Sequence, residues 1–274
     1  TKSSFPQEYN ALFKNIEVFG DSLGAGKLLR EEWTNQLKVT RATQNSNIDT
    51  LLWVGCIASL YSERSQRIAR AAVSILDKAG SRYTILGQEE LCCGDPARRL
   101  GNEYLFQLMV KKNIEIFNSI GVKKIVTFCP HCFHTFKNEY ATFGMKIEVV
   151  HVVEFIDKMI ADGSLKIRTR LKDQMTYHDP CYLGRYNSMY QQPRNILKST
   201  LDGNLIEMPH TRDKSICCGA GGGNFWKGKI IGKRIEKMRF EEARKSQVGG
   251  LITSCPFCTL MFESANQQDA VEKP

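Results

Sequence analysis

The sequence holds a pattern of five cysteines that occurs twice and includes all ten cysteines of the chain. Each copy has one cysteine, then an adjacent pair followed by glycine, then a pair spaced as CxxC. The two copies are Cys56, Cys92, Cys93, Cys129 and Cys132, and Cys181, Cys217, Cys218, Cys255 and Cys258. The first three positions are 125 residues apart between the copies, and the last two are 126 apart. A register that includes every cysteine predicts a duplicated site for a soft metal.

Adjacent cysteines and CxxC pairs are poor spacings for a disulfide scaffold and good spacings for metal ligands in a reducing compartment. We therefore expect a cytoplasmic protein, or one attached to the cytoplasmic face of a membrane. The 274 residues are 42% hydrophobic and 24% charged, which is typical of a soluble globular protein with room for two modest cores. No apolar run is long enough to span a bilayer, and the first ten residues lack the pattern of a secretory signal.

The formal net charge of +9 arises partly from a basic run near the end of the chain. Its members are Lys227, Lys229, Lys233, Arg234, Lys237, Arg239, Arg244 and Lys245. Three interpretations stay open: a solvated helix face that also carries Glu236, Glu241 and Glu242, a docking surface for an acidic electron-transfer partner, and a nucleic-acid site. Because the sequence shows no nucleic-acid-binding module, we expect no nucleic-acid partner.

Short apolar segments of strand character alternate with amphipathic helical segments in both halves. The predicted strands span residues 51–54, 83–86, 125–128, 147–150, 175–178, 205–208 and 251–253. Alternation at this length predicts parallel βαβ units. We therefore expect an α/β fold of two pseudo-symmetric halves with mostly parallel sheets: a connector at residues 1–48, a first cysteine-rich domain at 49–163 and a second at 164–274.

Four of the cysteines follow the carboxyl end of a predicted strand, where open α/β sheets build their sites: Cys56, Cys129, Cys181 and Cys255. Both CxxC pairs have proline in second position, which suits the first turn of a helix. A helix amino terminus offers free backbone N–H groups and a partial positive charge, which stabilise an anionic cluster of thiolates.

Five thiols per copy favour a polynuclear iron–sulfur site over a single zinc ion, which takes four ligands. The adjacent pair can bind two irons more easily than it can chelate one ion. The usual ferredoxin spacing is absent, and zinc in at least one copy stays an alternative. Gly94, Gly219 and Gly221 follow the paired cysteines, and we expect them to let the backbone approach a cofactor closely. Phosphate binding is a weaker interpretation of the GAGGG run at residues 219–223, since the run has no P-loop lysine–threonine pair.

The motif stretches carry a resemblance to a known family. They are WVGC, CCGDPARRLGNEYLF, VTFCPHCFHTFKNEY, YHDPCYLGRYN, CCGAGGG and SCPFC. The pattern C-x35-CCG-x34/35-CPxC resembles the cysteine-rich CCG domain of heterodisulfide reductase B and D subunits, glycolate oxidase and lactate-utilisation iron–sulfur subunits, and thiol:fumarate reductase. It looks most like the GlcF-like membrane oxidoreductases that pass electrons from electron-transfer flavoprotein to menaquinone. The resemblance covers roughly residues 50–265.

The resemblance implies one noncubane [4Fe-4S] cluster per complete five-cysteine set, and therefore two clusters here. Members of the membrane branch usually also carry a transmembrane haem b region and a ferredoxin-like domain. The chain does not begin with Met, and residues 1–48 resemble the segment that follows that ferredoxin domain. We therefore expect the soluble tail of a longer protein or one subunit of a complex. The implied partners are a ferredoxin-like domain, an electron-transfer flavoprotein or flavin dehydrogenase, and a membrane haem b protein.

His178 stands three residues before Cys181 and is a candidate catalytic residue. It either donates protons during disulfide or quinone chemistry, or is hydrogen-bonded within the fold at a strand end. His131 and His134 flank Cys132 and are either N–H donors to sulfur or exposed helix residues. Four aromatic residues are expected to pack rather than contact a substrate: Trp53, Trp226, Tyr182 and Tyr186.

Asp95, Arg98 and Arg99 follow the first CCG triplet and either neutralise cluster charge or pair with one another. Taken together, the sequence predicts an iron–sulfur oxidoreductase module. It would move electrons between a flavoprotein or ferredoxin-type donor and a quinone, a thiol/disulfide or a partner subunit. The alternatives are the catalytic subunit of a heterodisulfide reductase of the CoM-S-S-CoB type, and a zinc-stabilised structural module.

Overall fold

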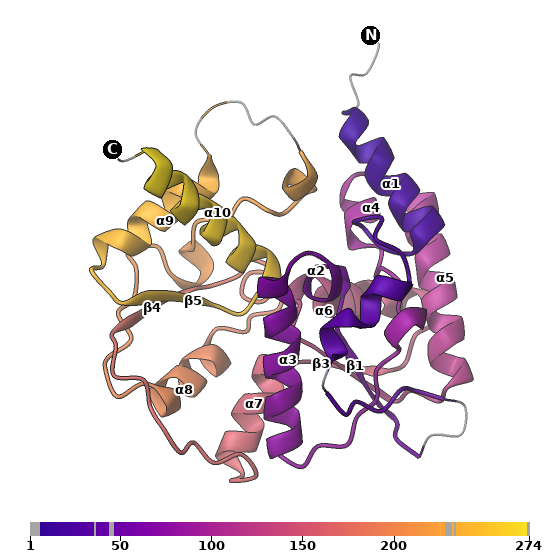
Figure 1. The fold of residues 1–274 in the computed structure, drawn as a ribbon, viewed down its shortest axis with the longest axis horizontal. Coiled ribbons are helices and arrows are strands. Elements are labelled where there is room, and N and C mark those ends of the chain that lie inside the picture. The colour runs from indigo at the N-terminus through magenta and orange to yellow at the C-terminus, as the bar shows by residue number, and fades with distance from the viewer. Residues whose placement is uncertain (1–5, 36, 44–46, 228–231, 233, 273–274) are drawn as a thin grey trace. The chain divides into compact units, whose positions relative to one another are not determined.

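The computed structural model describes residues 6–35, 37–43, 47–227, 232 and 234–272 (Figure 1). The chain divides into two compact units. Unit 1 comprises Thr1–His151 and Gly222–Gly228, and unit 2 comprises Val152–Gly221 and Lys229–Pro274. Each unit is built on a small sheet of parallel strands with helices between them, which confirms the predicted α/β fold.

The sheet of unit 1 has three parallel strands in chain order, β1 (Thr50–Trp53), β2 (Lys124–Thr127) and β3 (Glu148–His151). Its central residues are almost fully buried, as expected for parallel strands covered on both faces. The predicted strand at 83–86 forms only isolated bridges, from Thr84 to Leu51 and from Ile85 to Arg41. The sheet is therefore narrower than the apolar pattern predicts.

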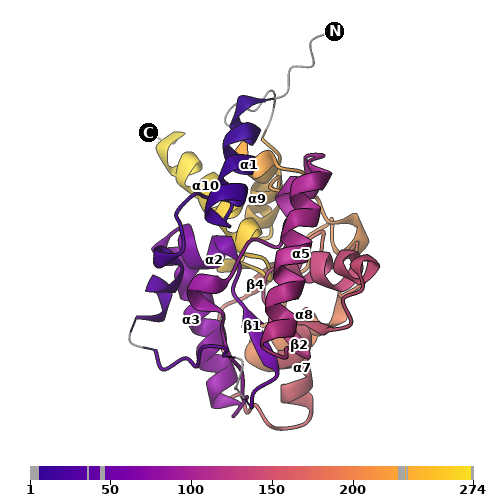
Figure 2. The same ribbon diagram turned by 90° about the vertical axis from the view of Figure 1, so that its right-hand side faces the viewer.

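Helices cover this sheet on both sides, with α3 and α5 on either side of β1 (Figures 1 and 2). The helices after β1 are α2 (Cys56–Leu60), α3 (Glu63–Lys78), η2 (Gly87–Glu89), α4 (Asp95–Arg99), α5 (Glu103–Ser119), α6 (Pro130–His134), the π-helical η3 (Thr135–Glu139) and η4 (Tyr140–Phe143). The side chain of Ser62 begins α3 in a capping box, and that of Asn102 caps α5. Trp53 at the end of β1 packs edge-on against Phe117 and Phe136 in the core.

The segment before β1 is part of the core of unit 1. It forms α1 (Gln7–Phe19) and the 3-10 helix η1 (Leu28–Thr34). Leu12 and Ile16 of α1 are buried, and so are Arg30 and Trp33 of η1. The backbone N–H of Cys92 donates to the carbonyl of Gly20 at 2.6 Å, so this segment is held directly to the first cysteine set.

Unit 2 has two parallel strands, β4 (Met175–His178) and β5 (Gly250–Thr253). The predicted strand at 205–208 contributes one isolated bridge, from Leu205 to Met175. Its helices are α7 (Val152–Ala161), α8 (Gln191–Thr200), η5 (Arg212–Lys214), α9 (Ile235–Lys245) and α10 (Pro256–Glu272), while η6 (Asn224–Trp226) belongs to unit 1. The core packs Tyr177 of β4 against Leu197 and Leu201.

The helix α7 packs against α8 within unit 2. The sequence places these residues at the end of the first domain (49–163), so the boundaries at 48 and 163 stay predictions about the duplicated sequence. Among the helices that the structure describes, none combines the length and apolar character needed to cross a membrane.

Candidate metal centres

The first set of cysteines gathers at the carboxyl ends of β1 and β2. Cys56 begins α2 three residues after the end of β1, and Cys129 is the N-cap residue of α6 after β2. Cys132 lies within α6, and the pair Cys92–Cys93 lies in the loop before α4. All five thiols are free and buried. The placement of Cys56 and Cys129 follows the strand-end position that the sequence predicts.

Within the first set the thiols interact in a continuous series: Cys56 with Cys92, Cys92 with Cys93, Cys93 with Cys132, and Cys132 with Cys129. The hydrogen bond with Cys92 and burial raise the pKa of Cys56 well above its usual value. Hydrogen bonds from Cys132 and Cys92 lower the pKa of Cys93 to about 7. Buried thiols this close resist carrying several negative charges without a cation, because like charges disfavour one another. The set is therefore suited to bind a cationic centre that deprotonates all of them.

The second set repeats this series in the same order: Cys181 with Cys217, Cys217 with Cys218, Cys218 with Cys258, and Cys258 with Cys255. Cys181 follows β4, and Cys255 immediately precedes α10. Hydrogen bonds from Cys181 and Cys218 lower the pKa of Cys217 to about 2. The hydrogen bond between Cys181 and Cys217 raises the pKa of Cys181.

The two sets differ in exposure. In the second set Cys218, Cys255 and Cys258 are buried, whereas Cys181 and Cys217 are partly exposed. All five cysteines of the first set are buried, so the second set is the more accessible of the two to solvent.

A glycine N–H donates to a cysteine in each set. The N–H of Gly94 donates to Cys92 Sγ at 3.4 Å, and that of Gly219 donates to Cys217 Sγ at 3.3 Å. Both glycines have positive φ, +86° and +89°. Other residues rarely adopt this conformation, so the turn that aims the N–H at sulfur requires glycine. A Cβ on Gly221 would meet no atom within 4 Å, and a cofactor-binding role for this glycine stays a prediction.

An arginine also donates to the first cysteine of each set. Arg30 Nη2 donates to Cys56 Sγ at 3.3 Å, and Arg185 Nη2 donates to Cys181 Sγ at 3.2 Å. Arg30 is buried and pairs with Glu90, whose carboxylate also accepts the N–H groups of Val54 and Gly55. Sequence reasoning did not predict either arginine. Arg185 had a usable signal, four residues after Cys181, whereas Arg30 lies outside the repeat.

Charged residues beside the first set pair with one another, the second of the two alternatives for Asp95 and Arg99. Asp95 Oδ2 is 3.0 Å from His131 Nδ1. Burial acts to raise the pKa of Asp95, but its hydrogen bond with His131 and the charges of His131 and Arg99 hold it below the usual value. His131 is therefore a buried partner of a carboxylate, and the expectation of an exposed helix residue is wrong for it. His134 Nε2 lies 3.5 Å from Glu139.

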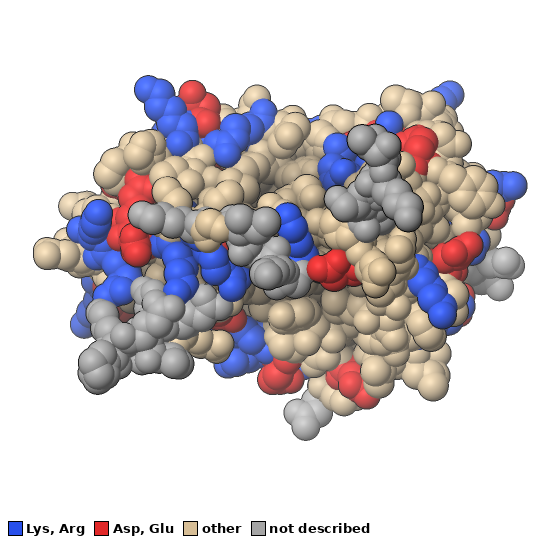
Figure 3. All heavy atoms as spheres, turned by 90° about the horizontal axis from the view of Figure 1, so that it is seen from above, with Lys and Arg blue, Asp and Glu red and all other residues tan. Residues whose placement is uncertain are grey.

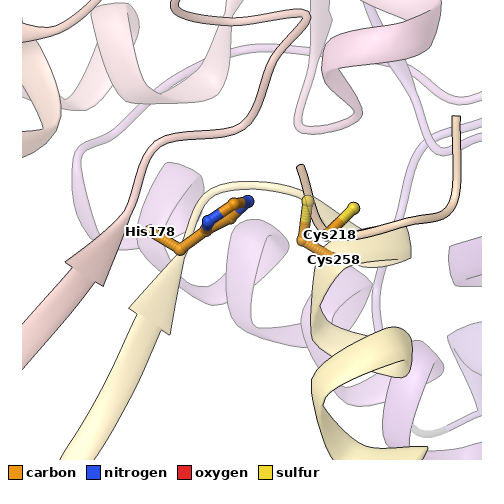
Figure 4. Close-up of side chains that lie close together, drawn as sticks. All are labelled: His178, Cys218 and Cys258. Carbon is orange, nitrogen blue, oxygen red and sulfur yellow. The ribbon is translucent and has the colours of Figure 1, made fainter. Parts of the chain in front are cut away.

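His178 ends β4 and is fully buried next to the second set. Its ring, Cys218 Sγ and Cys258 Sγ lie within 4.8 Å of one another (Figure 4). Arg239 Nε donates to His178 Nδ1 at 3.2 Å. Burial, with the positive charge of Arg239, lowers the pKa of His178 to about 3. The imidazole is therefore neutral and hydrogen-bonded within the fold, and proton donation by His178 stays untested.

Part of the basic run lies in the interior of the protein. Arg239 is fully buried and binds Glu242 at 2.6 Å, and Glu236 is also buried, so neither belongs to a solvated face. Arg244 and Lys245 are exposed, and Lys229 and Lys233 lie outside the described residues. On the face drawn in Figure 3, lysines and arginines form separate groups with acidic residues among them.

Comparison with known proteins identifies the family of this chain. The model of the cysteine-rich CCG domain matches residues 50–137 and 175–263. EtfAB:quinone oxidoreductase of Syntrophomonas wolfei is 40% identical over 95% of this chain and 38% of its own length. The probable iron-sulfur-binding oxidoreductase FadF of Bacillus subtilis is 37% identical over 99% of this chain and 39% of its own.

One subunit of the dihydromethanophenazine:CoB–CoM heterodisulfide reductase of Methanosarcina mazei is 30% identical over 77% of this chain and 52% of its own length. The chain thus spans about two fifths of the first two relatives. Both matched segments contain one complete five-cysteine set. The chain belongs to the family of proteins with the cysteine-rich CCG domain, and it carries two copies of that domain.

Proposed function

We propose that this chain is the electron-transfer part of an iron–sulfur oxidoreductase, with one noncubane [4Fe-4S] cluster in each five-cysteine set. The observation that carries the proposal is the identical order in which the five thiols of each set interact. The names of two relatives, an EtfAB:quinone oxidoreductase and a probable iron-sulfur-binding oxidoreductase, support it.

The residues present fit such a group better than a single zinc ion. A structural zinc site is closed by four ligands, whereas each set offers five adjoining thiols. The glycine and arginine N–H groups that point at sulfur also stabilise thiolates. When bound, an iron–sulfur cluster supplies reversible transfer of single electrons.

The protein's own residues hold the thiols, shield them and set their charge. Burial limits the access of water to the first set, and Arg30 with the Gly94 N–H offsets negative charge there. The second set is left partly open at Cys181 and Cys217. Of the two, the second set is therefore the better placed to meet a substrate or a redox partner.

The donor and acceptor follow from the relatives as part of the same proposal. The donor is an electron-transfer flavoprotein or another flavin dehydrogenase, reached through a ferredoxin-like domain, and the acceptor is a quinone such as menaquinone. A membrane haem b partner and a position at the cytoplasmic face complete this arrangement. The acidic partner surface would meet exposed basic residues such as Arg244 and Lys245.

A second candidate function is the reduction of a heterodisulfide. The partial exposure of Cys181 and Cys217 favours it, because a disulfide needs access to the site. The relative named as part of a heterodisulfide reductase points the same way.

Matched cysteine variants test the cluster assignment. Cys93→Ala and Cys218→Ala change the same position of the two sets, so each is the control for the other. We expect Cys93→Ala to remove or convert one low-temperature EPR signal and Cys218→Ala to do so to the other. Spectra that stay unchanged in both variants would contradict the ligand assignment.

The acceptor is tested with the chemically reduced protein. Mixing it in a stopped-flow instrument with a soluble menaquinone analogue should reoxidise it faster than mixing with an organic disulfide. The opposite order would favour the heterodisulfide reductase function.

A further inference from the structure

Each cysteine set has a buried aromatic ring at the same position, three residues before its first cysteine. Trp53 ends β1 and precedes Cys56, and His178 ends β4 and precedes Cys181. Both side chains are 0% exposed. Trp53 Nε1 and His178 Nε2 have no hydrogen-bond partner among the described residues. A buried ring nitrogen without a partner is unfavourable, and two at equivalent positions point to a shared missing partner.

The proton on His178 can be placed from its other ring nitrogen. The guanidinium of Arg239 can only donate, so His178 Nδ1 accepts that hydrogen bond. With Nδ1 as the acceptor, the ring carries a proton on Nε2. Nε2 is therefore an N–H donor, and its lone pair is not free to bind iron.

Each ring lies near the last cysteine of its set. A ring nitrogen of His178, Cys218 Sγ and Cys258 Sγ all lie within 4.8 Å of one another (Figure 4). A Cβ placed on Gly55 would lie 3.9 Å from Trp53 Nε1 and 3.5 Å from Cys132 Sγ. Trp53 Nε1 and Cys132 Sγ thus border the same small space, and Cys132 corresponds to Cys258 in the repeat. Edge contacts with Phe117 and Phe136 fix the orientation of the indole ring.

We propose that Trp53 and His178 have equivalent roles. Trp53 donates its ring N–H to sulfur of the cluster in the first set, and His178 donates its ring N–H to sulfur of the cluster in the second set. The inference rests on the proposed function, since it needs an iron–sulfur cluster in each set. A hydrogen bond to cluster sulfur stabilises the more negative, reduced state and raises the reduction potential. The two copies of the domain would thus make the same hydrogen bond to cluster sulfur with two different side chains.

The test is an EPR-monitored redox titration of anaerobically purified wild type, Trp53→Phe and His178→Phe. Phenylalanine keeps a ring and removes the N–H. Each variant should lower the potential of its own cluster by about 59 mV, a tenfold change in a one-electron equilibrium, and leave the other cluster unchanged. His151→Phe is the matched control, since His151 is a buried histidine at the end of β3 with no cysteine three residues later. It should leave both potentials unchanged.

Conservative variants keep the inference testable if the phenylalanine variants fold poorly. His178→Gln and Trp53→His each retain an N–H donor, and we expect both to hold potentials closer to wild type than the phenylalanine variants. Iron per chain is measured on every sample, so that a lost cluster is not mistaken for a shifted potential.

Pulsed EPR on protein assembled in D2O gives a second readout. A weak coupling to an exchangeable deuteron should be present in wild type and absent from the matching signal of each phenylalanine variant. A strong nitrogen coupling from His178 would show iron ligation and overturn the donor role. Fully loaded phenylalanine variants with unchanged potentials would overturn this inference alone, whereas wild type without iron and sulfide would overturn the proposed function as well.

Discussion

At the residue scale, the two arginines that donate to the first cysteine of each set differ in their surroundings. Arg30 is buried and shares Glu90 with the backbone of Val54 and Gly55. Arg185 is exposed and also donates to the carbonyls of Asp213 and Ser215. The same contact with sulfur is therefore part of a buried ion pair in one copy and lies at the surface in the other.

Replacing these arginines should therefore have unequal effects. Arg30→Leu leaves Glu90 as a buried carboxylate without its cation, which should cost about 3–5 kcal/mol of the free energy of unfolding. Arg185→Leu removes exposed hydrogen bonds, and we expect a loss of about 1 kcal/mol or less. Denaturant midpoints of the anaerobically purified proteins measure both. Equal losses in the two variants would contradict the role given to the buried pair.

The cysteines themselves could be found from the sequence because all ten share one register. Their donors could not. Arg30 comes from a segment without a repeat counterpart. The Trp53 N–H without a partner is visible only in the folded structure, where Trp53 Nε1 and Cys132 Sγ both lie near Gly55. Arg239 looked like a surface residue in a basic run, and only the fold shows that its guanidinium is buried against His178.

At the scale of elements, the strand-then-cysteine arrangement was predictable, and the extent of pairing was not. Apolar runs mark β1 and β2 correctly, but the segments at 83–86 and 205–208 make only isolated bridges. The pattern of apolar side chains indicates which residues are buried. It does not indicate how many backbone hydrogen bonds a segment forms with a neighbouring strand. The N-terminal helix had a usable signal, because Tyr9, Leu12 and Ile16 recur at helical spacing.

The N-terminal segment should stabilise the first set in particular. Ile16 of α1 is 0% exposed, whereas Leu28 of η1 is 77% exposed. Ile16→Ala should cost about 2–5 kcal/mol and speed iron loss from the first set, because α1 leads into the Gly20 contact with Cys92. Leu28→Ala is the matched control and should change neither. If Ile16→Ala released iron from both sets at equal rates, the specific link would be wrong.

At the scale of the whole molecule, the duplication gives two sites with separate ligands and similar donors but different access. The order of thiol contacts, the glycine N–H and the arginine recur in both sets. All five cysteines of the first set are buried, whereas Cys181 and Cys217 of the second set are partly exposed. The repeat in the sequence predicts the similarity, and the difference depends on the covering segments, which do not repeat.

This difference predicts the order of metal loss. Under a membrane-impermeant iron chelator in air, the EPR signal that Cys218→Ala affects should decay before the signal that Cys93→Ala affects. The cause is solvent access to Cys181 and Cys217. Decay in the reverse order would contradict the assignment of the open site to the second set.

The most direct test of the central claim is the content of iron, zinc and acid-labile sulfide per chain in protein purified without oxygen. Two [4Fe-4S] clusters predict about eight irons and about eight sulfides, with little zinc. About one zinc per five-cysteine set and no sulfide would contradict the redox function and identify a structural module.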